Sequence, residues 1–208
     1  MYNNLLSFGD IIELNLKCDV SKVMFNITNN IKNYKWLQYN PRKNINRYGL
    51  SVTSTDGSFN GIDLDSIAEY NKENNTNYDE SSFKKYTNVY YDCYETRRLV
   101  DPFRPWLWRT HYLNFRQGGY FPPHRDMRKV DNQESFRILV PIRGCNMPEL
   151  YFMYEDKPLH FNMGNAYFVN TNKMHSIFSF TDNAYMLVMN IECTDESLKK
   201  VGELIKWK

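Results

Sequence analysis

The pattern of apolar and polar positions changes near residue 105 of this chain. After that point, short apolar segments alternate with polar positions and end at Gly, Pro, Asn or Asp, a pattern typical of β-strands. The clearest case is residues 136–142, where Phe136 and Ile138 begin one face and Arg137 and Leu139 begin the other. Short strands at regular spacing are typical of a sandwich or barrel. The predicted strands are residues 109–115, 120–126, 136–142, 150–154, 159–161, 166–170, 175–180 and 185–193.

The first half of the chain predicts fewer strands. Residues 11–16 alternate and predict one strand, and apolar residues at helical spacing after Asp19, a fair N-cap, predict a helix to about Tyr34. We expect this helix to cover the outside of the sheet with its apolar stripe. At the other end of the chain, Thr194 can cap a short helix that runs to about Lys206 and packs on the sheet.

Three segments between these elements are polar or irregular. Residues 40–61 predict a loop or edge hairpin, whose Arg42, Lys43 and Arg47 either face an acidic ligand or are simply solvated. Residues 63–71 predict a helix with Asp63 as its N-cap. Residues 83–98 are rich in Tyr and charge without a clear period, and we expect an ordered excursion that contributes to the wall over a site.

The length and composition of the chain limit the classes of protein to which it can belong. A chain of 208 residues fits one domain, divided here into covering elements (1–105), a β-rich half (106–193) and a terminal helix (194–208). The net charge of +2 gives no electrostatic reason to expect a nucleic-acid partner. No apolar run approaches the roughly 18 residues needed to span a bilayer, and the four cysteines form no CxxC pair. We therefore expect a soluble cytoplasmic protein with reduced thiols.

The strongest chemical signal is a pair of residues in GGYFPPHRD. His124 and Asp126 are two residues apart, so on an extended chain both side chains point to the same side while Arg125 points away. His175 follows about 50 residues later in a separate predicted strand. If sheet pairing brings it alongside, the three residues form a 2-His-1-carboxylate facial triad, which binds Fe(II) and leaves three coordination positions open.

These residues resemble a known family. The motif GGYFPPHRD, the segment FRILVPI and the segment NAYFVNTNKMHSIFSF are similar to the aspartyl/asparaginyl (and proline) hydroxylase-like branch of the 2-oxoglutarate- and Fe(II)-dependent oxygenases, and NPRKNINRYGLSVTSTDG is like a segment of its phage-encoded members. The resemblance spans about residues 36–194. It implies a mainly β fold with flanking helices (α+β), built on a double-stranded β-helix (jelly-roll, cupin-like) core. It also implies that His124, Asp126 and His175 are the catalytic metal ligands.

The same resemblance implies a site for the cosubstrate 2-oxoglutarate, and here the chain departs from the family. Arg137 stands in the position of the arginine that contacts the cosubstrate carboxylate, and its planar guanidinium suits a two-pronged contact. A surface arginine paired with an acid is the alternative interpretation. Most relatives also carry Arg or Lys about ten residues beyond the second histidine, where this chain has Ala184, Tyr185 and Met186. Other residues that could supply the missing donors are Tyr112, Asn114 and Arg116, or Arg47 and Ser51.

The implied activity is hydroxylation of an unactivated carbon of an Asp-, Asn- or Pro-type side chain. The substrate would be a peptide or a free amino acid. The reaction would consume 2-oxoglutarate and O2 at Fe(II) and release succinate and CO2. A phage-encoded enzyme would work in the host cytoplasm. Two alternatives remain, a cupin-like enzyme that uses a metal without 2-oxoglutarate and a non-catalytic β-helix binding module. His111 and His160 are not expected to be ligands: His111 if Tyr112 on the same strand points inward, and His160 because it sits between two apolar strand residues.

Overall fold

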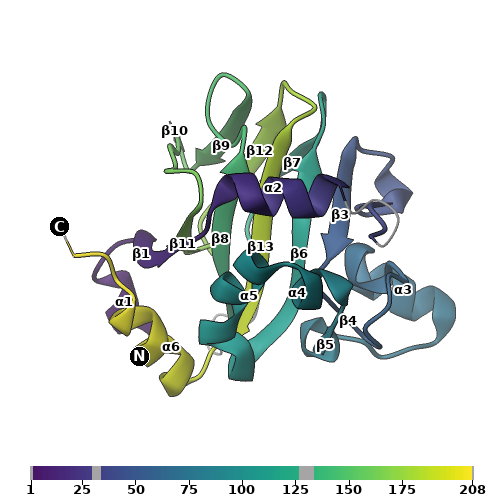
Figure 1. The fold of residues 1–208 in the computed structure, drawn as a ribbon, viewed down its shortest axis with the longest axis horizontal. Helices are drawn as coiled ribbons and strands as arrows, with labels where there is room; N and C mark the ends of the chain where they lie inside the picture. The colour runs from purple at the N-terminus through teal and green to yellow at the C-terminus, as the bar shows by residue number, and fades with distance from the viewer. Residues whose placement is uncertain (1, 30–33, 127–133, 208) are drawn as a thin grey trace.

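Two facing antiparallel sheets form the centre of the protein (Figure 1). The computed structural model describes residues 2–29, 34–126 and 134–207. The larger sheet has the strand order β1-β11-β8-β13-β6-β3-β2, and the smaller one has the order β10-β9-β12-β7. The strands are β1 (Ile11–Lys17), β2 (Leu37–Gln38), β3 (Arg47–Ser51), β4 (Thr53–Ser54), β5 (Lys85–Tyr86), β6 (Leu107–Phe115), β7 (Tyr120–His124), β8 (Ser135–Arg143), β9 (Leu150–Tyr154), β10 (Lys157–Pro158), β11 (Asn165–Val169), β12 (His175–Ser179) and β13 (Ala184–Glu192). This arrangement confirms the predicted double-stranded β-helix core with flanking helices.

The alternation along β8 shows how the sequence divides the interior into two layers. Phe136 and Ile138 join the core between the large sheet and the helices, whereas Leu139 joins the core between the two sheets. Because successive side chains of a strand point to opposite faces, Arg137 falls on the same side as Leu139, as the sequence predicts. The space between the sheets is therefore apolar in its depth and receives a charged side chain near its mouth.

Helices cover the outer face of the large sheet. In Figure 1, α2 runs across the strands, with α4 and α5 lying on the same face beside it. Asp19 caps α2 by accepting from the amides of Ser21 and Lys22, at 3.0 and 3.2 Å, and Thr194 caps α6 in a reciprocal bond with Ser197, which confirms both predicted caps. The helices are α1 (Tyr2–Leu6), α2 (Val20–Asn29), α3 (Ile67–Asn74), α4 (Asn88–Asp92), α5 (Tyr94–Val100) and α6 (Asp195–Glu203), with 3₁₀ turns η1 (Pro41–Lys43), η2 (Ile62–Leu64), η3 (Glu80–Ser82) and η4 (Asp101–Trp106). The helix α2 is described as far as Asn29, residues 30–33 lie outside the described residues, and Tyr34, the predicted end of this helix, is not helical.

Three predictions for the first half need correction. Asp63 is not an N-cap: it lies fully buried within η2, and the helix α3 begins after Ser66. Residues 83–98 form β5, α4 and α5, and these helices pack on the outer face of the large sheet rather than over a site. Within residues 40–61, β3 does pair near the sheet edge, between β2 and β6, but it is largely buried, with β6 and η2 packed against it.

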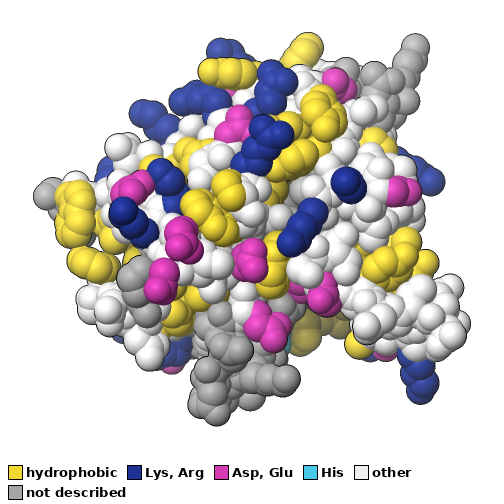
Figure 2. All heavy atoms as spheres, turned by 90° about the horizontal axis from the view of Figure 1, so that it is seen from below, with side chains coloured by type: hydrophobic (Ala, Val, Ile, Leu, Met, Phe, Trp, Pro, Cys, Tyr) yellow, Lys and Arg dark blue, Asp and Glu magenta, His cyan; other side chains and the backbone are white. Residues whose placement is uncertain are grey.

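The surface carries both signs of charge. Figure 2 shows one face of the molecule, on which basic, acidic and hydrophobic side chains are interspersed. Among the described residues, no helix is both long and apolar enough to cross a membrane.

Candidate metal centre

Strand pairing brings the two predicted histidine ligands together. His124 ends β7 and His175 begins β12, and the antiparallel register places them directly opposite each other, with ring centroids 4.2 Å apart. The turn before β7 requires glycine, because a Cβ on Gly119 would overlap the carbonyl of Asn46 and the preceding Gly118 has a φ of +76°. The Gly118–Gly119 turn thus sets the position from which β7 runs to the site.

Asp126 joins this pair from the residues that follow β7. Its amide donates to the Thr171 carbonyl at 2.9 Å, which fixes the backbone beside the loop that leads to His175. One carboxylate oxygen lies 3.5 Å from His124 Nε2, and the other lies 3.3 Å from Arg137 Nε. Ligand atoms of His124, Asp126 and His175 all lie within 4.8 Å of one another, so a single ion can contact all three.

Hydrogen bonds to the backbone fix how the two imidazoles present themselves. His124 Nδ1 lies 2.7 Å from the Pro122 carbonyl, and His175 Nδ1 lies 2.9 Å from the Lys173 carbonyl. Since a carbonyl only accepts, each Nδ1 carries a proton, and Nε2 is the ring nitrogen left to face a metal. This is the arrangement in which histidine binds divalent ions.

The electrostatics of the three groups also suit a cation. Burial would raise the pKa of Asp126, but the charge of Arg137 and the hydrogen bond from His124 outweigh it and hold this pKa well below its usual range. Burial lowers the pKa of His175, while the hydrogen bond to Asp126 raises that of His124. Asp126 is therefore ionised and His175 neutral at neutral pH.

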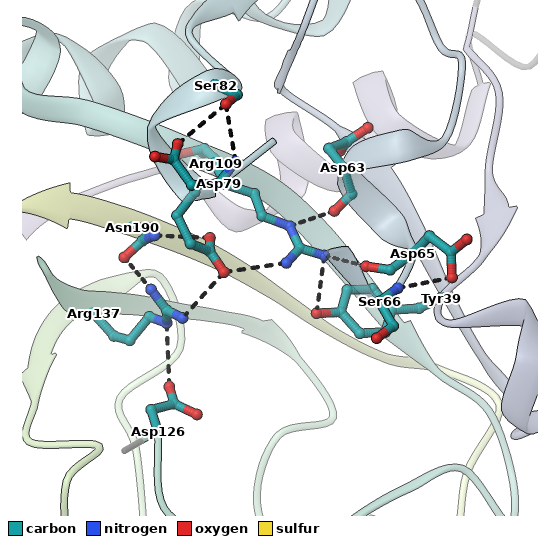
Figure 3. Close-up of polar contacts among 12 residues, drawn as sticks. Tyr39, Asp63, Asp65, Ser66, Asp79, Ser82, Arg109, Asp126, Arg137 and Asn190 are labelled. Carbon is teal, nitrogen blue, oxygen red and sulfur yellow. Dashed lines mark hydrogen bonds and ion pairs between the residues drawn. The ribbon is translucent and has the colours of Figure 1, made fainter. Parts of the chain in front are cut away.

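Arg137 lies in a network of polar side chains above the triad (Figure 3). It contacts Asp126, donates to the Asn190 side chain and approaches the Glu80 carboxylate at 3.9 Å. Glu80 comes from η3, is buried, and also lies 3.3 Å from Arg109 of β6. The network therefore ties a turn from the first half of the chain to the mouth of the β-helix.

Arg109 is the most extensively bonded residue of this network. Besides Glu80, its guanidinium donates to the Asp63 carbonyl, to the Asp65 carbonyl at 3.2 Å and to the Tyr39 hydroxyl at 3.4 Å. Figure 3 shows these bonds converging on Arg109 from Tyr39 and from the segment that carries Asp63 and Asp65. Arg109 thereby holds that segment and η3 against β6.

Two connected spaces lie beside the triad. A narrow, partly open cavity of about 110 Å³ between the sheets is polar toward the triad and apolar in its depth. A wider groove of about 900 Å³ opens to the surface and shares Tyr39, Glu80, Arg109, Phe121, His124, Asp126 and Arg137 with the cavity. The depth of the cavity is lined by Leu113, Leu139, Phe152, Ile177, Met186 and Val188.

The other predicted cosubstrate residues are not brought to this cavity. Tyr112 points into the core between the large sheet and the helices, where its hydroxyl lies 2.8 Å from that of Thr96. Asn114 donates to the carbonyls of Asp182 and Ala184. Arg116 lies over the Tyr48 ring, 4.2 Å from its centroid. The assignment of faces on β6 was therefore wrong, because the outer face of this strand is buried by α5 and accepts a tyrosine.

The corrected face of β6 places Arg109 and His111 in the cavity. His111 is not within the group of possible metal ligands, and its buried Nδ1 has no hydrogen-bond partner among the described residues. Burial and the charge of Arg109 lower its pKa, so the ring is neutral. His160 is exposed, follows β10, and is not one of the residues that line the cavity or the groove.

Sequence reasoning missed Glu80 and Asn190 altogether. Glu80 sits in the polar segment YDESS, which carries no periodic signal, and Asn190 lies in an apolar strand where one amide is unremarkable. A polar residue within the buried strand β13 is the only sign that could have marked Asn190, since strand interiors rarely bury an amide without a partner.

Comparison with known proteins adds information about the fold. No model of a protein family matches the chain, and no curated protein does. Solved structures do match: a prolyl hydroxylase from Trichoplax adhaerens, in complex with a hypoxia-inducible factor peptide fragment, is 11% identical, with a TM-score of 0.50 over 94% of this chain and 88% of that one. A prolyl 4-hydroxylase from Pseudomonas putida is 8% identical, with a TM-score of 0.47 over 92% and 96%. A viral collagen prolyl hydroxylase from Paramecium bursaria Chlorella virus 1, in its 2-oxoglutarate complex, is 11% identical, with a TM-score of 0.43 over 88% and 95%.

The chain has a cupin-like fold. It is similar in structure to a prolyl hydroxylase over most of its length, with little identity in sequence. The likeness extends to the fold, and the chemistry has to be argued from the triad and its surroundings.

Proposed function

We propose that this protein is a 2-oxoglutarate- and Fe(II)-dependent dioxygenase. It hydroxylates an unactivated carbon of an amino-acid side chain of the Asp, Asn or Pro type, in a peptide or free, and releases succinate and CO2. The observation that carries the proposal is the convergence of His124, Asp126 and His175 from β7, the residues after it and β12, with both Nδ1 atoms bonded to backbone carbonyls and the carboxylate ionised.

The donor set fits Fe(II). Two neutral imidazoles and one carboxylate are the ligands of a facial triad, and the arrangement leaves neighbouring positions for other ligands on the side of the cavity and groove. Arg137 orients Asp126 from outside the triad, as residues behind metal ligands commonly do. Bound iron, with 2-oxoglutarate and O2, supplies the oxidising chemistry that no side chain of this protein can supply.

The cavity offers a place for the cosubstrate. Arg137 provides a guanidinium at the boundary of cavity and groove, while Thr171 and Asn190 add polar groups nearby. Its apolar depth excludes water from the side of the triad that faces the interior. The residues of this chain thus bind and orient, and the wider groove admits the primary substrate.

Succinate formation tests the proposal before any substrate is known. Protein loaded with Fe(II) under anaerobic conditions is mixed with 2-oxoglutarate and exposed to air, beside Asp126→Ala and a control, His160→Ala, which alters an exposed histidine outside the site. We expect slow succinate release from the wild type and the control and none from Asp126→Ala. Equal release from Asp126→Ala would remove the triad from the reaction.

One observation favours a second candidate, a cupin-like metal enzyme that does not use 2-oxoglutarate. Arg137 already contacts Asp126, Asn190 and Glu80, and β13 lines the cavity with Met186, Val188 and Asn190 instead of a basic residue. In the same assay, iron binding without binding of 2-oxoglutarate would favour this candidate.

A further inference from the structure

Arg47 is a buried arginine whose charge is not matched by an acid. It begins β3, is 4% exposed, and donates from Nη1 to the Tyr120 carbonyl at 2.7 Å. Its guanidinium carbon lies 3.9 Å from the centre of the Phe121 ring and 5.2 Å from that of Tyr39. Its Nε is buried without a hydrogen-bond partner, and within residues 2–29, 34–126 and 134–207 no carboxylate lies within ion-pair distance of it.

Three other arginines near the groove differ from Arg47 in this respect. Arg109 and Arg137 both approach Glu80. Arg42 pairs with Asp65 at 2.9 Å and also donates to Glu73. Burying an unpaired charge is costly, and aromatic rings offset only part of that cost because they provide no acceptor for the Nε–H. The surroundings of Arg47 are therefore those expected of a side chain that binds an anion.

The position of Arg47 indicates which ligand this anion belongs to. Arg47 lines the wide groove but not the narrow cavity, whereas Arg137 lines both. Phe121 contacts Arg47, and its ring centroid lies 5.9 Å from that of His124. The guanidinium thus lies one aromatic ring away from the triad, along the wall of the groove that would admit a primary substrate.

We propose that Arg47 forms an anion-binding subsite that receives a carboxylate of the primary substrate, next to the carbon that reacts. The inference rests on the proposed function, because the triad defines where the substrate reacts. The carboxylate belongs either to an acidic side chain of a peptide or to the free α-carboxylate of an amino acid. A groove of about 900 Å³ has the size that takes a ligand larger than one residue, which favours the acidic peptide.

Three small probes test whether the subsite prefers a carboxylate, and whether that carboxylate is on a side chain or on the α-carbon. N-acetyl-aspartate N′-methylamide carries a side-chain carboxylate only, N-acetyl-alanine carries an α-carboxylate only, and N-acetyl-asparagine N′-methylamide carries neither. Each is titrated by NMR into the ¹⁵N-labelled full chain loaded with Zn(II), with and without 2-oxoglutarate. We expect at least one charged probe to bind about tenfold or more tightly than the neutral probe, as a two-pronged charge contact implies. No preference for either charged probe would overturn the inference.

Two matched variants test whether Arg47 is responsible. Arg47→Met keeps an unbranched apolar chain between Tyr39 and Phe121 and should lose the preference for the charged probe. Arg97→Met is the control, because Arg97 also donates to a backbone carbonyl, that of Tyr91 at 2.8 Å, and lies over a tyrosine ring, but does not line the groove. An unchanged preference in Arg47→Met, or a loss of 2-oxoglutarate binding with the preference retained, would overturn the assignment to the primary substrate.

A wild-type measurement covers the case in which Arg47→Met does not fold. The Nε–H signal of Arg47, assigned by its absence in Arg47→Lys, should shift with the charged probe and stay in place with the neutral one. If the Nε–H signal does not shift when the charged probe is added, the proposed subsite is wrong. Succinate formation by the same samples is scored separately: a charge preference in a protein that forms no succinate supports the subsite and contradicts the oxygenase, whereas succinate formation without a charge preference overturns only the subsite.

Discussion

The buried carboxylate of Glu80 offers the sharpest test of how the mouth of the β-helix is built. One of its oxygens faces Arg109 at 3.3 Å and Arg137 at 3.9 Å, and the other accepts from the Asn190 amide at 2.8 Å. A carboxylate accepts at both ends, but the amide of Glu80→Gln has one acceptor end and one donor end. Either the NH2 group meets the two guanidinium groups or it meets the NH2 group of Asn190, so neither orientation satisfies all partners.

The size of the effect follows from burial. Removing one member of a buried ion pair costs about 3–5 kcal/mol, and because glutamine keeps the volume and one acceptor we expect about 3 kcal/mol. With an m-value of about 2 kcal/mol/M in urea, the midpoint of unfolding should fall by about 1.5 M. The loss should change little with added salt, since the pair is shielded from solvent.

Asp79→Asn is the matched control for Glu80→Gln. Asp79 precedes Glu80, is exposed, and loses the same charge, while asparagine still serves as an N-cap for η3. We expect Asp79→Asn to cost less than about 1 kcal/mol. If urea unfolding gives the two variants the same midpoint, Glu80 does not act as the ionised partner of two arginines and the network has been misinterpreted.

Three further predictions concern single residues. Burial raises the pKa of Asp63 from 3.8 to about 6, so the free energy of unfolding of the wild type should fall by up to about 3 kcal/mol relative to that of Asp63→Asn as the pH rises from 4 to 7. Unfolding curves of the two proteins should therefore diverge across this range, and a difference in stability that does not vary with pH would contradict the burial argument. His175→Ala should abolish binding of Co(II) or Fe(II) with the fold retained, whereas His160→Ala should bind normally; metal binding that survives in His175→Ala would exclude this histidine as a ligand. Arg137→Lys keeps the charge but loses the two-pronged geometry, and should weaken 2-oxoglutarate binding about tenfold in a calorimetric titration; undiminished affinity would place the cosubstrate elsewhere.

The sequence alone determined the features that depend on local geometry. Arg137 shares a face with Leu139 because alternate residues of an extended chain point the same way, and His124 and Asp126, two residues apart, both reach the triad as their spacing predicts. Asp19 and Thr194 cap helices because a short polar side chain can reach the free amides of the first turn without help from the rest of the chain. Each of these depends on neighbours within a few residues, which the sequence displays directly.

Only the tertiary structure decided which neighbours meet across the fold. β6 is buried on both faces, so alternation could not tell which set of its residues faces the cavity, and the sequence-based assignment put Tyr112 where His111 lies. Glu80 and Arg47 come from polar segments that look solvent-exposed in the sequence, but pairing with β6 and packing of η3 bury both. The burial of a polar side chain is set by what the rest of the chain places over it, and that depends on contacts between residues far apart in the sequence.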